Sequence, residues 1–140
     1  MGLLEWSDAL RLEHAAMDDT HREFVELLNR VGAASGDDLL ACLDEFIAHT
    51  EAHFGQEERW MEAMQFPPLA CHRSEHEGVL EIMREVRKRI AGGEARYGEV
   101  LANAIVEWFP QHAQSMDAVL ALYIRQTGFD TTAPTAPEVV

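Results

Sequence analysis

Apolar residues recur at about every 3.6 positions along most of this chain, and no alternating strand pattern persists. The pattern stops at three breaks rich in glycine or proline, namely Gly32 with Gly36, Pro67-Pro68, and Gly92-Gly93. Such residues end helices, because glycine adopts the left-handed conformation and proline lacks a backbone donor. Four long amphipathic segments with short connections remain. We therefore expect an all-α chain that folds as an up-down-up-down four-helix bundle.

The residues beside these breaks predict where the helices begin and end. Asp18 or Asp19 can cap the first helix, and Asp37 or Asp38 can cap the second, which is expected to end near Met64. The apolar stripe of the third helix runs over residues 69–90, and that of the fourth over residues 101–122. Residues 1–17, with Trp6, are expected to form an irregular N-terminal arm, residues 18–127 the bundle, and residues 128–140 a flexible tail.

The charge and the cysteines limit the possible partners and compartment. Asp and Glu outnumber Lys and Arg by 25 to 11, which gives a net charge of −14. Such a surface repels phosphate backbones and anionic lipid, so neither nucleic acid nor membrane is an expected partner. Cys42 and Cys71 are too few for a disulfide framework, and no stretch approaches the roughly 18 apolar residues of a membrane span. We expect a cytoplasmic monomer.

Histidines and carboxylates interrupt the apolar stripes. His53 and Glu57 are four residues apart, as are His72 and His76, so each pair lies on one helix face that points into the bundle. His21 and His112 occupy the stripes of the remaining two helices. One inward histidine is more often a hydrogen-bonded core residue, but donors on all four helices favour a transition-metal site, since imidazole and carboxylate both bind such ions.

Asp117 does not fit this spacing, because it follows His112 by five residues, about 140° around an ideal helix. Pro110 lies just before His112 and removes a backbone donor. We hypothesise that this distortion, or a π-type turn near it, brings His112 and Asp117 to one cluster.

Four segments together resemble the hemerythrin family: DDTHREFVELLN (18–29), HFGQEERWM (53–61), HRSEH (72–76) and WFPQHAQSMD (108–117). The resemblance covers roughly residues 5–125. It implies a non-heme pair of iron ions with an oxo or hydroxo bridge that reversibly binds molecular oxygen. His72, His76 and His112 would ligate one iron, His21 and His53 the other, and Glu57 and Asp117 would bridge them. One coordination position, on the iron with two histidines, then remains for the external ligand.

The same resemblance suggests the residues around the ligand. Candidate pocket walls are Leu28, Phe54, Trp108 and Phe109, although ordinary core packing is an equally good explanation of each. Ser115 is small and polar where oxygen carriers of the family tend to place a bulky apolar residue. If it opens the pocket to water or small anions, oxidation of the centre to its inert diferric state should be faster.

Other interpretations remain open at this point. An enzyme acting on peroxide, oxygen or nitric oxide would need a substrate channel and a proton donor, and the sequence identifies neither. An iron-storage protein is a further alternative, although ferritin-like bundles use glutamates with Glu-x-x-His pairs. His49, one turn before His53, is either a groove histidine or a residue that supports the ligands, and Glu58 is either solvated or in contact with a ligand.

Overall fold

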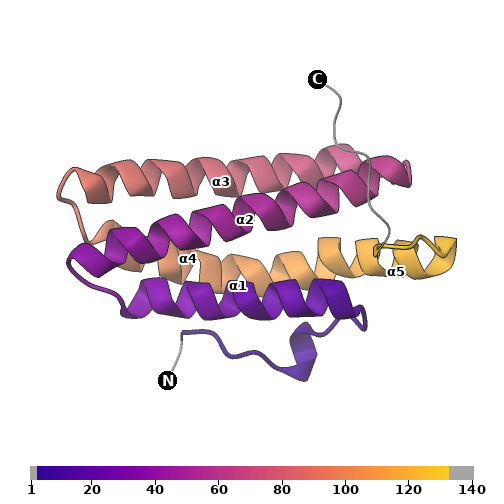
Figure 1. Ribbon diagram of the computed structural model, residues 1–140, viewed down its shortest axis with the longest axis horizontal. Coiled ribbons are helices and arrows are strands. Elements are labelled where there is room, and N and C mark those ends of the chain that lie inside the picture. Colours follow the sequence, from indigo (N-terminus) through magenta and orange to yellow (C-terminus); the bar gives the residue numbers. More distant parts are fainter. Residues whose placement is uncertain (1–2, 133–140) are drawn as a thin grey trace.

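The computed structural model describes residues 3–132, which are helical apart from the arm, the connections and the last few residues. The elements are η1 (Asp8–Leu10), α1 (Ala15–Ala33), α2 (Asp37–Ala63), α3 (Leu69–Ala91), α4 (Tyr97–His112), η2 (Ala113–Asp117) and α5 (Ala118–Thr127). Here η1 is a 3-10 turn and η2 is a π-helical turn. Because α4, η2 and α5 continue one another, they form a single fourth rod (Figure 1).

Each rod packs against two neighbours. α1 contacts α2 and the α4 segment, and α3 contacts the same two from the other side. Short connections reverse the chain between successive rods, as Figure 1 shows. The predicted up-down-up-down four-helix bundle is therefore confirmed. None of the helices in residues 3–132 is long and apolar enough to cross a membrane.

The first helix begins earlier than predicted. α1 starts at Ala15, and the Nδ1 atom of its cap residue His14 accepts a hydrogen bond of 3.2 Å from the Met17 backbone. Asp18, predicted as a cap, is instead buried in the first turn, where its carboxylate accepts the backbone N–H groups of Leu12 at 2.8 Å and His14 at 3.3 Å. Asp18 thus ties the arm to the helix.

The arm lies along α1, beneath it in Figure 1. Leu4 exchanges two backbone hydrogen bonds with the Asn29 side chain, at 3.0 and 2.8 Å, and Arg22 lies 5.2 Å from the ring centre of Trp6. At the other end, Gly128 closes α5 with a φ of 69°. The following Phe129 packs against apolar residues of the bundle, so the predicted flexible tail begins with an ordered contact. Its residues 133–140 lie outside the described ones.

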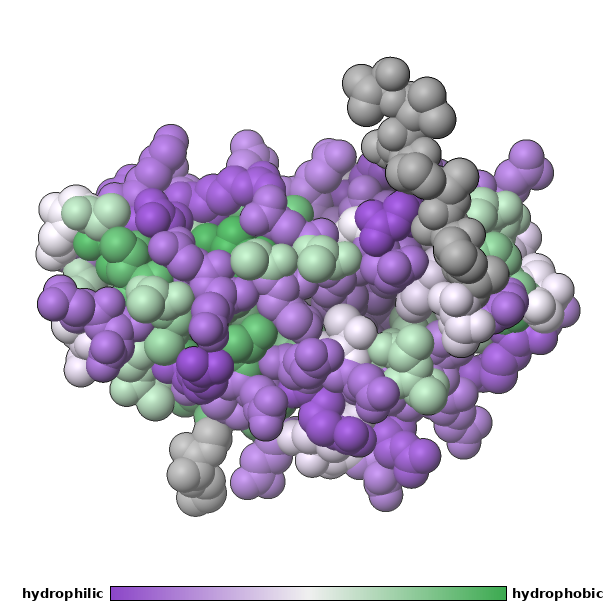
Figure 2. Space-filling model, in the orientation of Figure 1, coloured by the Kyte–Doolittle hydropathy of each residue, from purple (hydrophilic) through white to green (hydrophobic). Residues whose placement is uncertain are grey.

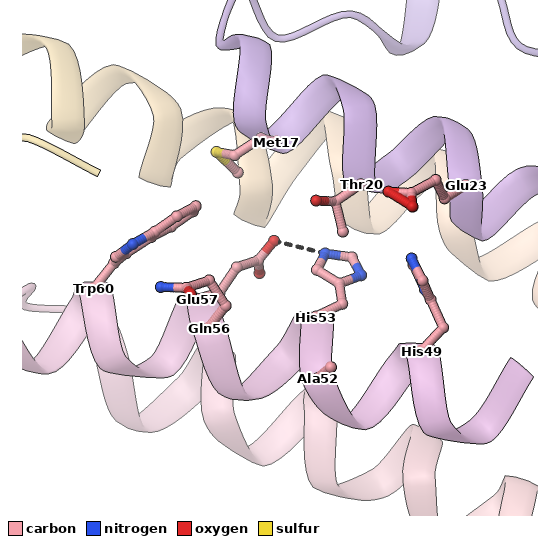
Figure 3. Close-up of a pocket in the computed structure, with 9 residues that line it drawn as sticks. All are labelled: Met17, Thr20, Glu23, His49, Ala52, His53, Gln56, Glu57 and Trp60. Atoms are coloured by element: carbon pink, nitrogen blue, oxygen red, sulfur yellow. Dashed lines mark hydrogen bonds and ion pairs between the residues drawn. The ribbon is translucent and has the colours of Figure 1, made fainter. Parts of the chain in front are cut away.

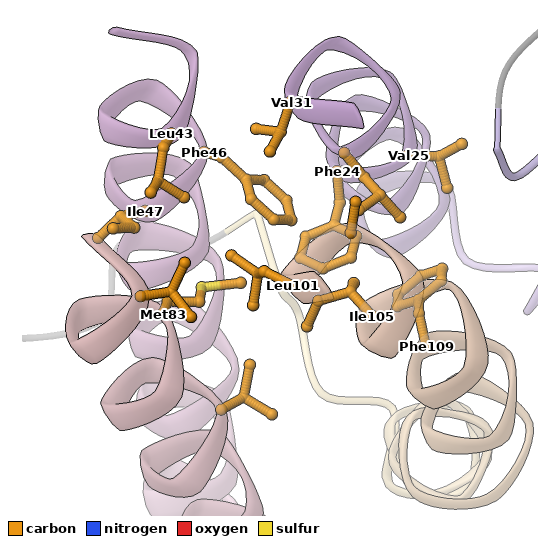
Figure 4. Packing of buried hydrophobic residues seen from close by; sticks show 14 of the residues in the cluster. Phe24, Val25, Val31, Leu43, Phe46, Ile47, Met83, Leu101, Ile105 and Phe109 are labelled. Carbon is orange, nitrogen blue, oxygen red and sulfur yellow. The ribbon is translucent and has the colours of Figure 1, made fainter. Parts of the chain in front are cut away.

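The apolar core has two parts. The larger includes Phe24 and Phe46, whose rings are 4.9 Å apart and point toward Leu101 (Figure 4). The smaller contains Leu12, Met17, Trp60, Met61, Phe66, Leu120, Ala121 and Ile124. Along every rod the predicted metal ligands fall between members of these two clusters. Outside, polar and charged side chains cover most of the face in Figure 2, as the net charge requires.

Candidate metal centre

All seven predicted ligands meet in the middle of the bundle. His21 comes from α1, His53 and Glu57 from α2, His72 and His76 from α3, His112 from the end of α4, and Asp117 from the end of η2. None of these residues is more than 6% exposed. The i, i+4 spacing on α2 and α3 therefore points both pairs inward, as the sequence predicts.

The π-helical turn η2 accounts for Asp117. It spans the five residues after His112, and each residue of a π-helix turns less than one of an α-helix, so a step of five residues returns to nearly the same face. The His112 Nε2 atom lies 3.2 Å from Asp117 Oδ1. The hypothesised π-type turn is confirmed, while Pro110 is accommodated within α4.

The two carboxylates divide their oxygens between two sets of histidines. Glu57 Oε1 lies 3.4 Å from both His72 Nε2 and His76 Nε2, whereas Oε2 lies 2.8 Å from His53 Nε2 and 3.7 Å from His21 Nε2. Asp117 Oδ1 lies 3.1 Å from His72 Nε2 and 3.2 Å from His112 Nε2, and its Oδ2 lies 3.2 Å from His21 Nε2. Each carboxylate thus faces a three-histidine set and a two-histidine set.

Many polar atoms of this cluster are buried without a hydrogen-bond partner among residues 3–132. They include Nε2 of His21, His72, His76 and His112, Oε1 of Glu57 and both carboxylate oxygens of Asp117. Each unpaired buried polar atom lowers the free energy of unfolding by about 1–3 kcal/mol. This many unpaired atoms in one place therefore require a common partner. Five imidazoles and two carboxylates with ligand atoms this close form two groups that can each hold a metal ion. The donor set fits a pair of transition-metal ions.

The close carboxylates favour the protonated form of the buried histidines. Burial alone would lower the pKa of His21, but the Asp117 and Glu57 carboxylates, 3.2 and 3.7 Å from its Nε2 atom, outweigh it and raise the pKa to about 10. The same competition raises the pKa of His72 to about 9. Burial acts in the opposite sense on the carboxylates, yet the surrounding histidines hold the pKa of Glu57 and of Asp117 well below the usual range.

Two glutamates outside the cluster orient its histidines. Glu75 Oε1 accepts hydrogen bonds from His112 Nδ1 and from the Trp108 indole N–H, both at 2.9 Å. Glu58 Oε2 accepts from His76 Nδ1 at 3.1 Å, and Glu58 is itself paired with Arg73. A carboxylate on Nδ1 fixes the proton there and leaves Nε2 free to bind metal.

Sequence reasoning left the role of Glu58 open and missed Glu75. Each adjoins a ligand in the chain, Glu58 after Glu57 and Glu75 before His76. That adjacency is the signal available to find them.

Aromatic rings close the three-histidine side. Phe54 stacks on His76 with ring centres 3.8 Å apart, and Trp108 stacks on His112 at 4.4 Å. On the other side, Phe109 meets His21 of the two-histidine set edge-on at 5.2 Å. Three predicted pocket residues therefore contact ligands, while Leu28 is fully buried in the larger apolar cluster.

The prediction for Ser115 is wrong. The residue is exposed, and its hydroxyl donates a 2.6 Å hydrogen bond to the Gln111 backbone oxygen rather than facing the cluster.

The two-histidine side borders a cavity of about 210 Å³ between α1 and α2 (Figure 3). Its lining includes the predicted ligands His53 and Glu57 but none of the three-histidine set. The remaining lining residues are Met17, Thr20, Glu23, His49, Ala52, Gln56 and Trp60. The packing around the cluster is therefore asymmetric, with stacked rings on one side and open volume on the other.

This fold and its buried donors define a cation-binding helical bundle. Residues 12–123 match the model of the hemerythrin HHE cation binding domain. A bacteriohemerythrin of Ralstonia nicotianae is 48% identical over 93% of this chain and 95% of its own length, and one of Stenotrophomonas maltophilia is 31% identical over 86% and 81%. The chain belongs to the hemerythrin family. The crystal structure of a hemerythrin variant, 23% identical, covers 88% of this chain and 98% of its own with a TM-score of 0.80, which supports the fold.

Proposed function

We propose that this protein binds molecular oxygen reversibly at a pair of iron ions within the bundle. The observation that carries the proposal is the division of carboxylate oxygens, because Glu57 and Asp117 each direct one oxygen toward each histidine set. That arrangement suits two ions bridged by both carboxylates better than one ion. The names of the relatives, bacteriohemerythrin and hemerythrin, support iron and oxygen.

The proposed ligand roles follow the distances. His72, His76 and His112 would hold one ion and His21 and His53 the other, with Glu57 and Asp117 between them and an oxo or hydroxo bridge completing the centre. Two iron ions would supply the electrons and the open coordination position that oxygen binding needs. The lower number of histidines and the adjoining cavity both favour ligand access on the side of His53.

The chain's own residues would keep such binding reversible. Phe54 and Trp108 exclude water from His76 and His112, and Phe109 excludes it from His21 of the two-histidine set, which limits the protons that reach the centre. Glu75 and Glu58 keep His112 and His76 in one tautomer, so their Nε2 atoms remain available. Small anions of the size of oxygen would fit the same side of an oxidised centre.

We further propose that the protein acts as a carrier, store, scavenger or sensor of oxygen, as a cytoplasmic monomer. Its two cysteines are both free, as is usual in a reducing compartment. The strongly negative surface opposes self-association.

A cycle of oxygenation tests the proposal. Metal-free protein is loaded with Fe²⁺ under argon, exposed to oxygen, and returned to argon while its visible absorption is recorded. We expect a band that appears with oxygen and disappears on its removal through several cycles, with two iron ions retained per chain, as implied by the two ligand groups. Zinc-loaded protein is the matched control and should show no band. Irreversible oxidation with turnover of peroxide would identify an enzyme instead, and release of the iron would identify a storage protein.

A further inference from the structure

The seven clustered residues are almost completely buried, so an ion must pass between helices to reach them. Every ligand is at most 6% exposed, and stacked rings of Phe54 and Trp108 cover the three-histidine side. The cavity between α1 and α2 instead reaches the cluster directly, at His53 and Glu57. A route through this cavity avoids the stacked faces of His76 and His112.

The cavity is lined by two potential metal-binding side chains outside the cluster, His49 and Glu23, in addition to His53 and Glu57. His49, His53 and Glu57 follow one another at successive turns of α2, each about 5–6 Å further along the axis. The His49 ring lies edge-on to His53, with ring centres 6.1 Å apart. His49 Nδ1 is buried and has no hydrogen-bond partner among residues 3–132. α2 therefore presents a ladder of donors from the outer part of the cavity to the cluster.

Glu23 completes the outer step of this ladder. It lies on α1 opposite His49, and the two side chains face each other across the cavity (Figure 3). Glu23 is exposed and forms no ion pair with any residue of the described part of the chain. A carboxylate in an acidic protein repels anions and attracts cations, and imidazole with carboxylate suits divalent first-row transition metals.

We propose that His49 and Glu23 form a transient binding site for a divalent transition-metal ion, from which the ion passes to His53 and Glu57. The donor ladder lets the ion exchange water for protein ligands one turn at a time instead of losing its hydration shell in one step. This inference rests on the cluster holding metal, as in the proposed function, but not on the oxygen chemistry.

The rate of metal uptake tests the site. Metal-free protein is mixed with Fe²⁺ under argon, a strong iron chelator is added after set times, and the iron that stays with the protein is measured. His49→Phe keeps a ring against His53 but removes both nitrogens, and Glu23→Gln removes the charge at constant size. We expect Glu23→Gln to slow uptake by about tenfold or more, because a carboxylate in a cleft raises the association rate of cations by that order. His49→Phe should also slow uptake, because it removes the nitrogen donors next to His53. The final iron content should equal that of the wild type.

Glu26→Gln is the matched control. Glu26 is exposed one turn from Glu23 on α1, outside the cavity lining, so its loss changes the net charge equally and should leave the rate unchanged. Uptake by His49→Phe or Glu23→Gln at the wild-type rate would overturn the inference. A lower final iron content would also overturn it, because the residue would then belong to the resident site. Normal uptake without reversible oxygen binding would overturn only the proposed function, and wild-type protein that retained no iron would overturn both.

Discussion

Replacing Glu57 by glutamine tests whether this carboxylate bridges two ions. The substitution keeps the shape of the side chain but exchanges one oxygen for an NH2 group, which cannot bind metal. Both histidine sets are affected, since Glu57 Oε1 faces His72 and His76 and Oε2 faces His53. A bridging role predicts weaker binding of both ions, whereas a ligand of a single ion would affect one.

The expected magnitude follows from the lost charge. Two unit charges about 4 Å apart contribute roughly 4 kcal/mol at an effective dielectric constant of about 20, and a divalent ion doubles that. Dehydrating the buried carboxylate offsets part of the gain, because Glu57 is only 1% exposed. A net loss of about 4 kcal/mol per ion remains, which weakens binding roughly a thousandfold.

Glu58→Gln is the matched control for this experiment. Glu58 is the next residue of α2 and contacts the cluster only through His76 Nδ1, at 3.1 Å. Its replacement should weaken binding about 10- to 100-fold, as is usual for partners of ligating histidines. Isothermal titration calorimetry of the metal-free proteins with Zn²⁺ gives the affinity and the stoichiometry of binding without redox chemistry. If Glu57→Gln bound two ions as tightly as Glu58→Gln, Glu57 would not be a bridge.

Four further outcomes are expected. Phe54→Ala should destabilise the fold by about 3–5 kcal/mol, because the ring is 2% exposed and stacks on His76, and thermal unfolding should show a melting temperature lowered by roughly 10 °C or more. Metal binding near pH 7 should release at least two protons per chain, because the pKa values of about 10 for His21 and about 9 for His72 favour their protonated forms in the metal-free protein, and the pKa of His112 is raised as well. Calorimetry in buffers of different ionisation enthalpy measures this release, which should fall as the pH rises through 9 to 10. The same raised pKa values stabilise the metal-free fold fully below about 6.5, and this contribution should be lost through pH 9 to 10 in chemical denaturation. Ser115→Leu should leave autoxidation unchanged in stopped-flow absorption, since Ser115 is exposed and bonded to Gln111; faster or slower oxidation would mean that the residue reaches the ligand after all.

Periodicity and helix breaks were sufficient to predict the bundle. α2 and α3 begin and end where glycine and proline interrupt the apolar stripe. The start of α1 was less predictable, because His14 and Asp18 are both able to accept backbone hydrogen bonds. The choice between them depends on the path of the arm, which the Asp18 bonds to Leu12 and His14 determine.

The clustering of the seven residues could be predicted because donors on a helical stripe must face inward, whereas their surroundings depend on packing between helices. Glu75 reaches His112 and Trp108 from another helix, and no spacing within one segment reveals such a contact. Ser115 was misplaced for a local reason. A step of two residues is about half a turn of either an α-helix or a π-helix, so a residue two positions before the inward Asp117 in η2 faces outward.

The position of the cluster explains how a small bundle tolerates so many buried polar groups. Each rod places its ligands between two apolar clusters, one around Phe24 and Phe46 and one around Trp60 and Leu120. These clusters fix the helices on both sides of the polar layer, so the ligands are positioned before metal arrives. Within the described part of the chain, the layer contains unpaired buried atoms of Glu57, Asp117 and all five histidines, and each such atom lowers the stability of the metal-free fold. Protonation of His21 and His72 offsets part of this cost. A bound ion would satisfy the same atoms, so metal binding and fold stability would depend on the same residues.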